Sequence, residues 1–139
     1  MSHTQNTLAL DTSVVIRLLM QQPVALYERA AEFLEAQLLS GAIIVVPDEV
    51  LAETYYVLQS FYQMPKDRAL KSLAALGAGR GISLSPVAQA VLSLPNLASA
   101  KPGFVDRLIH GAALANGQTL VTFEQSARKL SRTIVLPGT

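Results

Sequence analysis

The sequence predicts an α/β fold, a sandwich in which helices cover a mainly parallel central sheet. Two observations lead to this prediction. Short, uncharged runs rich in β-branched residues alternate with longer segments in which apolar residues recur at helical spacing. Pro, Gly, Ser and Asp stand between these segments, as is typical of helix starts and ends. A chain of 139 residues fits one domain, so we expect residues 1–139 to form a single domain.

The first part of the chain predicts two strands and four helices. Residues 7–10 form a mostly apolar run that indicates a buried strand, and Thr12 or Ser13 can cap a helix that ends near Met20. The next helix covers 23–39, and its apolar positions at helical spacing are Leu26, Ala30, Phe33, Leu34 and Leu38. The elements expected after it are a strand over 42–46 and helices over 48–62 and 66–78.

The remaining elements continue the alternation. In order, we expect a short strand over 82–84, a helix over 86–94, a helix from 102 or 103 to 116, a strand over 119–122, a short helix over 124–130 and a strand over 133–136. The glycine-rich stretch 77–81 follows a helix rather than a strand, so we interpret it as a turn and not as a dinucleotide-binding loop.

Composition excludes several classes of protein. The chain has no Cys, which rules out a thiol nucleophile, a thiolate zinc site and a disulfide scaffold. Only 15% of the residues are charged, against about 25% in an average soluble domain, so we expect part of the apolar surface to meet a partner chain. The longest uncharged run, 81–100, contains two prolines and is not expected to cross a membrane. No secretory signal is apparent, and we expect a cytoplasmic protein.

Charge is distributed unevenly along the chain. Residues 1–53 contain seven acids and two bases, whereas residues 54–139 contain three acids and nine bases. An acidic half and a basic half in one small domain favour a site that holds cations and faces a polyanion. The alternative is that the asymmetry reflects ordinary solvated faces of the protein.

Four acids stand near the expected ends of strands. Asp11 ends the first strand, Glu53 lies in the helix after the second, Asp106 lies in the first turn of its helix, and Glu124 follows the fourth strand. In parallel sheets, ligands bind beyond the carboxyl ends of the strands. Carboxylates gathered there repel one another, and a hard divalent cation relieves that repulsion. The alternatives are that Asp11 is only a helix cap, that Glu53 is a solvated carboxylate, and that Asp106 and Glu124 are ordinary first-turn acids.

Three segments together resemble a known family. The segments LALDTSVVIRLL, VPDEVLAETYYVL and FVDRLIHGAALANGQTLVTFEQSARKL resemble the acidic motifs of PIN-domain ribonucleases, especially the VapC-like toxins of bacterial toxin–antitoxin pairs. The resemblance implies a PIN-like α/β/α sandwich with a sheet of four or five strands. It also implies that Asp11, Glu53 and Asp106 hold Mg²⁺ or Mn²⁺. Glu124 stands where the family usually has Asp, and Ser126 stands where many members carry another acid.

The resemblance further implies an activity and partners. The expected activity is metal-dependent endoribonuclease cleavage of RNA that leaves a 5′-phosphate and a 3′-hydroxyl. The expected partners are an RNA substrate, a cognate antitoxin that wraps an apolar groove, and a second copy of the chain in a homodimer. The basic side chains expected to contact RNA phosphates are Lys101, Arg107 and Arg128, with Lys129 and Arg132 beside them. The alternative for each is plain solubilising charge.

Other functions remain open at this stage. Ser126 and the Glu at position 124 favour a PIN-like module that binds RNA or protein without cutting. Phosphoryl transfer with Asp11 as the nucleophile is disfavoured, because Ser13 stands where such enzymes need a second acid. His110, four residues after Asp106, could move protons, but we interpret it as a packed histidine.

Overall fold

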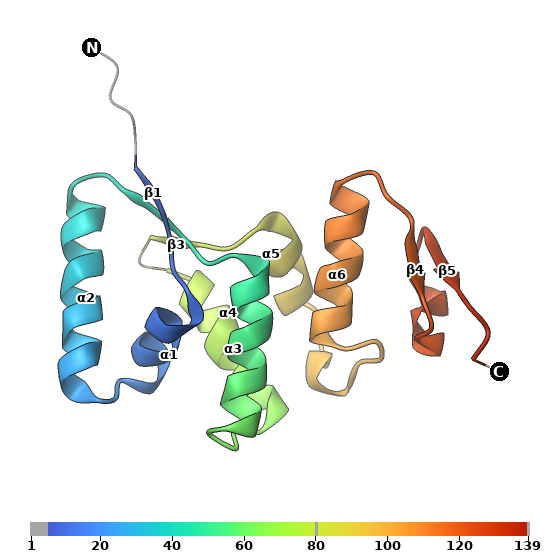
Figure 1. Cartoon of the computed structure of the whole chain (residues 1–139), viewed down its shortest axis with the longest axis horizontal. Coiled ribbons are helices and arrows are strands. Elements are labelled where there is room, and N and C mark those ends of the chain that lie inside the picture. The colour runs from blue at the N-terminus through green and yellow to red at the C-terminus, as the bar shows by residue number, and fades with distance from the viewer. Residues whose placement is uncertain (1–5, 80, 139) are drawn as a thin grey trace, which may run out of the picture. The chain divides into compact units, whose positions relative to one another are not determined.

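The computed structural model describes residues 6–79 and 81–138, and the chain divides into two compact units, Met1–Ser85 and Pro86–Thr139. Each unit has its own parallel sheet and its own helices, and each is described by itself (Figure 1). Within the described residues, no helix is long and apolar enough to cross a membrane.

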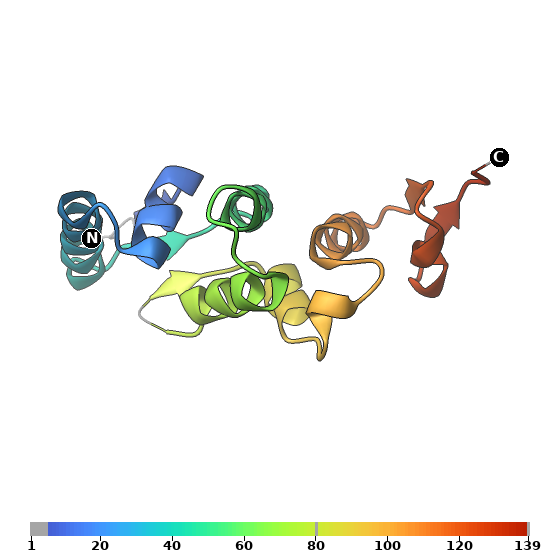
Figure 2. The same ribbon diagram turned by 90° about the horizontal axis from the view of Figure 1, so that it is seen from below.

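The first unit is a three-stranded parallel sheet with four helices. Strand order is β1-β2-β3, and Leu8 stands opposite Ile44, which stands opposite Ile82. The elements, in chain order, are β1 (Thr7–Ala9), α1 (Thr12–Met20), α2 (Val24–Leu39), β2 (Ile43–Val45), α3 (Asp48–Ser60), α4 (Lys66–Gly77) and β3 (Ile82–Ser83). Seen from below, α1 and α2 lie on one side of the unit and α4 on the other (Figure 2).

Local sequence explains where these helices begin. Proline is the N-cap residue of α2, α3 and α4, and its fixed φ prepares the chain to enter a helix. The cap of α1 differs from the prediction, because Asp11 rather than Thr12 or Ser13 occupies the N-cap position. The Asp11 carboxylate accepts the Val14 N–H, which would otherwise lack a partner in the first turn.

The core of the first unit lies between its helices and the sheet. The fully buried side chains there include Val15, Ile44, Leu51, Leu58 and Leu73. The predicted apolar face of α2 is only partly correct. Leu34 is buried, but Leu26 and Phe33 are 41% and 51% exposed, because the neighbouring elements cover a narrower stripe of the helix than its apolar spacing suggests.

The second unit contains two packed helices and a two-stranded parallel sheet. Its elements, in chain order, are α5 (Pro86–Leu92), η1 (Leu97–Ser99), α6 (Phe104–Ala115), β4 (Leu120–Thr122), η2 (Gln125–Lys129) and β5 (Thr133–Val135). Gly111 of α6 lies against Val87 of α5, and a Cβ at position 111 would collide with that valine side chain. Phe104 and Leu108 turn from α6 into the core of the unit.

The α/β class predicted from the sequence is confirmed. All five expected strands are present, and every pairing between them is parallel. Three of the strands form the sheet of the first unit and two form the sheet of the second. The 3₁₀ helix η1 was not predicted, and the short helix expected over 124–130 is the 3₁₀ helix η2.

Among the residues that the structure describes, one buried side-chain polar atom has no hydrogen-bond partner. Thr54 of α3 is 0% exposed, and its Oγ1 makes no hydrogen bond. We therefore expect Thr54→Val to raise the free energy of unfolding by about 1 kcal/mol, because the isosteric methyl removes an unsatisfied hydroxyl from the core. Urea denaturation measures the change. Thr133→Val is the matched control: Thr133 Oγ1 donates to the Ser131 carbonyl, so that variant should gain nothing. A Thr54→Val protein less stable than the wild type would contradict the prediction.

Candidate acidic site

Asp11 lies just beyond β1 and is exposed to solvent. Leu10 extends the pairing with β2 through its N–H to the Val45 carbonyl, so the chain reaches Asp11 directly from the sheet. The Ser13 hydroxyl donates to Asp11 Oδ1 at 2.6 Å, and the Val14 N–H donates to the same oxygen at 3.2 Å. These bonds, that of the Ser13 hydroxyl above all, lower the pKa of Asp11, so the side chain stays a charged carboxylate.

Glu53 and Asp106 are also exposed, one in each unit. Glu53 lies in the second turn of α3, the helix that follows β2. Thr54 and Leu51 on either side of it turn into the core, which fixes the face on which Glu53 stands. Asp106 lies in the first turn of α6, where a negative charge interacts favourably with the helix dipole.

Glu124 follows β4 and is the N-cap residue of η2. Its Oε1 accepts the Ser126 hydroxyl at 2.7 Å and the Ser126 N–H at 3.1 Å. Its own N–H donates to Thr122 Oγ1 at 3.0 Å. The two Ser126 bonds and the nearby charge of Lys101 lower the pKa of Glu124.

The hydrogen bonds from Ser126 to Glu124 were not predicted from the sequence, where Ser126 stands in place of an acid that many family members carry. The signal was present in the sequence, because Asp11-Thr12-Ser13 and Glu124-Gln125-Ser126 share the pattern acid-x-Ser just after a strand. In both segments the serine two residues on donates its hydroxyl to the acid. Ser13 thus donates to the Asp11 carboxylate, and Thr122 Oγ1 accepts the Glu124 backbone N–H.

The predicted phosphate-binding side chains all belong to the second unit, which also contains Asp106 and Glu124. Lys101 and Arg128 are exposed, and Arg107 is half-buried. Arg107 Nε donates to the Pro102 carbonyl at 2.7 Å, and Arg128 donates to Gln125 Oε1 at 2.6 Å. Both guanidinium groups are therefore held in place and keep further N–H donors for other contacts.

His110 has a structural contact, as the packed interpretation expects. Its Nε2 lies 2.7 Å from the Ser131 carbonyl oxygen. A carbonyl only accepts hydrogen bonds, so Nε2 carries the hydrogen and the ring ties α6 to the segment before β5.

The chemistry of the four acids fits a hard divalent cation. All four offer exposed carboxylate oxygens, the ligands that Mg²⁺ and Mn²⁺ prefer. Asp11 and Glu53 belong to the first unit and Asp106 and Glu124 to the second, so neither unit by itself contains three of them. Across residues 6–79 and 81–138, no three His, Cys, Asp or Glu side chains form a group that could hold a metal ion. The predicted shared site therefore stays a prediction.

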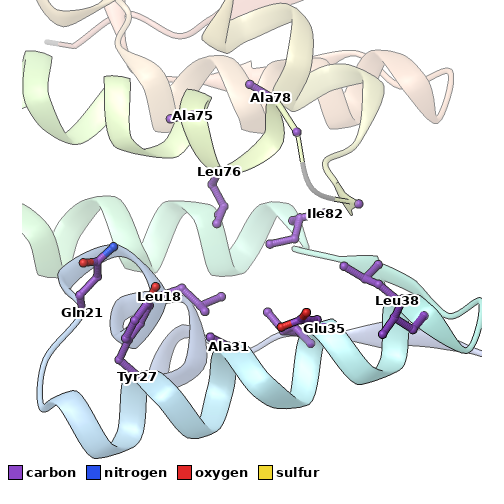
Figure 3. A pocket seen from close by; sticks show the side chains of 14 residues that line it. Leu18, Gln21, Tyr27, Ala31, Glu35, Leu38, Ala75, Leu76, Ala78 and Ile82 are labelled. Atoms are coloured by element: carbon purple, nitrogen blue, oxygen red, sulfur yellow. The ribbon is translucent and has the colours of Figure 1, made fainter.

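A separate pocket of about 970 Å³ opens in the first unit between α1, α2, α4 and β3. Leu76 of α4 and Ile82 of β3 point toward α2 across it (Figure 3). The α2 residues that line it include Ala31, Leu34 and Leu38. Among the described residues lining the pocket, Glu35 alone carries a charge.

The fold is that of an α/β protein, and two of the exposed acids, Asp11 and Glu124, come just after parallel strands, where ligands bind in such folds. The sequence profile of the PIN domain family matches residues 8–132, a span that crosses the boundary between the two units. The chain therefore belongs to the PIN domain family, as its three acidic segments predicted.

The crystal structure of VapBC2 from Rickettsia felis bound to a DNA fragment from their promoter contains a chain 19% identical to this one. The match covers 94% of this chain and 97% of that chain, with a TM-score of 0.38, so the family assignment rests on the sequence profile. No curated protein sequence matches this chain significantly.

We expect Ser13→Ala to raise the pKa of Asp11 toward the ordinary aspartate value, because the variant loses the bond that contributes most to the lowering. Because the pKa of Asp11 is lower in the folded state than in the unfolded state, its ionised form stabilises the folded protein at pH values above the unfolded-state pKa. That contribution to stability is lost as the pH falls through the folded-state pKa. The stability difference between wild type and variant should thus be present at pH 7 and shrink below about pH 4. Carbon-13 NMR titration of the carboxyl group measures the pKa. Ser40→Ala, which removes a bond to a backbone carbonyl, should leave it unchanged. An unaltered Asp11 pKa in Ser13→Ala would refute the assignment.

Proposed function

We propose that this chain is a Mg²⁺- or Mn²⁺-dependent endoribonuclease and the toxin of a toxin–antitoxin pair. Membership of the PIN domain family supports a nuclease. The observation that carries the proposal is the placement of the acids: Asp11, Glu53, Asp106 and Glu124 are all exposed, and each follows a strand or lies in the first or second turn of a helix.

Each of the four acids would have a defined role in binding the metal ion. Asp11, Glu53 and Asp106 would hold the ion, with Glu124 as the fourth ligand. A divalent ion bound by these acids supplies a lowered pKa for a bound water and neutralises charge on the phosphodiester. Asp11 would be ionised before any metal ion binds, since the hydrogen bond from the Ser13 hydroxyl stabilises its carboxylate and lowers its pKa.

Charge in the second unit supports a polyanionic substrate. Residues 86–139 contain five basic side chains and only two acids, and those two are Asp106 and Glu124. The basic side chains would bind the RNA backbone, Lys101 and Arg128 through exposed charges and Arg107 through the guanidinium that its bond to Pro102 orients. An RNA substrate is consistent with the cytoplasmic location predicted from the sequence.

The pocket of the first unit supports an antitoxin partner. It is apolar, open, and formed by helices, which suits an amphipathic helix of another chain laid into a groove. Glu35 at its edge would pair with a basic residue of that helix. We also propose a homodimer, which the exposed Tyr56 and Phe61 on and just after α3 support as an apolar contact surface.

A second candidate is a PIN-like module that binds RNA or protein without cutting. Ser126 favours it, because this residue stands where many relatives carry an acid. The two candidates differ in a measurable way: the nuclease binds Mn²⁺ and cleaves RNA, and the binding module does neither.

Asp11→Asn and Asp106→Asn should each lower the rate of Mn²⁺-dependent RNA cleavage by more than about a hundredfold. Loss of a residue that hydrogen-bonds a metal ligand typically lowers metal affinity or activity about 10–100-fold, and loss of the ligand itself should lower it more. Cleavage of a labelled single-stranded RNA, with and without a chelator, measures the rate. Asp67→Asn, an exposed acid in the first turn of α4, is the control and should keep full activity. Full activity in both variants would exclude this mechanism, and absence of both Mn²⁺ binding and cleavage in the wild type would favour the binding module.

Ala31→Glu should weaken binding of the antitoxin at least about tenfold. The new carboxylate would be buried in an apolar interface one helical turn from Glu35, without a partner for its charge. The test first requires a partner: a small DNA-binding protein encoded next to this chain is sought and co-purified with it, and titration calorimetry then measures the affinity. Ala36→Glu on the same helix is exposed and does not line the pocket, so it should bind as the wild type does. Equal affinity for the two variants would show that the partner binds elsewhere.

A further inference from the structure

The side-chain amide of Gln125 joins the ends of β4 and β5. Its Nε2 donates to the backbone carbonyl of Phe123, just after β4, and to that of Leu136, just after β5, each at 3.0 Å. A carbonyl oxygen only accepts hydrogen bonds, so the group that faces both carbonyls is the NH₂ of the amide. The orientation of the amide is therefore fixed by the main chain of two strands, and Oε1 is left to accept from another group.

Arg128 uses this oxygen. Its Nη2 donates to Gln125 Oε1 at 2.6 Å, and its side chain is exposed to solvent. Arg132, by contrast, donates to a backbone carbonyl, that of Gly117. A guanidinium group carries five N–H donors in a rigid planar fork, so the bond to Gln125 leaves donors for a further partner.

The charge around Arg128 favours an anion as that partner. Residues 125–139 contain three bases and no acid, and Lys129 next to Arg128 is exposed as well. A guanidinium can form two parallel hydrogen bonds with a phosphate group. A long side chain that is free in the unbound protein loses rotamer entropy when it binds, and a side chain that is already ordered loses less. The hydrogen bonds from carbonyl to amide to guanidinium provide that order before any ligand binds.

We infer that Gln125 is a positioning residue that holds the Arg128 guanidinium ready to bind a phosphate of the RNA backbone. Gln125 carries no charge and acts through Arg128. The inference rests on the proposed function, because it needs Arg128 to bind RNA. It requires neither a metal ion nor the first unit, since all the hydrogen bonds that carry it lie within the second unit.

The test measures the affinity of the full chain for a labelled single-stranded RNA oligonucleotide by fluorescence anisotropy, at several salt concentrations and with a chelator that keeps the RNA intact. We expect Gln125→Ala to lower the affinity about two- to tenfold, the equivalent of ordering one long side chain on binding. The salt dependence of the affinity should stay unchanged, because no charge is removed. Arg128→Ala should lower both the affinity and its salt dependence, since one phosphate contact is lost. Adding Gln125→Ala to Arg128→Ala should have no further effect.

A purely structural role of Gln125, as a link between β4 and β5, predicts a different result. Gln125→Ala would then lower the affinity by the same factor with or without Arg128. Lys129→Ala is the matched background, because it removes a neighbouring charge and should leave the effect of Gln125→Ala intact. Gln118→Ala, at an exposed glutamine of the same unit, should bind as the wild type does. Circular dichroism checks that each variant is folded, and Gln125→Met, which keeps the length of the side chain, replaces Gln125→Ala if alanine prevents folding.

The outcomes separate this inference from the proposed function. An effect of Gln125→Ala that disappears in the Arg128→Ala background and persists in the Lys129→Ala background supports the inference. Wild-type affinity in Gln125→Ala, or an equal loss in the presence and absence of Arg128, overturns it and leaves the proposed nuclease standing. A wild type that neither binds the RNA nor cleaves it with Mn²⁺ overturns both.

Discussion

The hydrogen bond from a serine hydroxyl to the carboxylate two residues before it is the interaction on which the candidate site depends. In Asp11 and Glu124 it favours the ionised form, orients the side chain and accompanies the start of the next helix. A helix cap and a metal ligand are usually weighed as rival explanations of such an acid. Here they are compatible, because the capping bonds use one carboxylate oxygen and leave the second for another partner.

The second unit contains few charged side chains, and most of them are basic. Beyond Ser85 only two acids occur, and both are candidate ligands, while the five bases give that part of the chain a positive charge. A positive field attracts a polyanion, and isolated acids within it attract cations to the same region. The lowered pKa of Glu124 reflects this arrangement, since the charge of Lys101 adds to the effect of the Ser126 bonds.

The sequence predicted the fold class and the order of elements because β-branched runs such as 42–46 and helix-starting prolines such as Pro47 act locally. It predicted less well where a neighbour decides the outcome. Apolar spacing marked Leu26, Phe33 and Leu34 alike, but only contact with other elements determines that Leu34 alone is buried. The bond between Ser126 and Glu124 was not predicted, because comparing residue types shows only that a serine stands where many family members carry an acid. The bond itself depends on the conformation of the turn between the two residues.

The second unit leaves several large apolar side chains exposed. Its sheet has only two strands, and sheets of that size are marginally stable without further packing. Val121 and Ile134, which pair across β4 and β5, are 56% and 52% exposed, and Phe123 just beyond them is 66% exposed. Such exposed side chains are candidates for contact with another surface, and the family profile continues without interruption from one unit into the other.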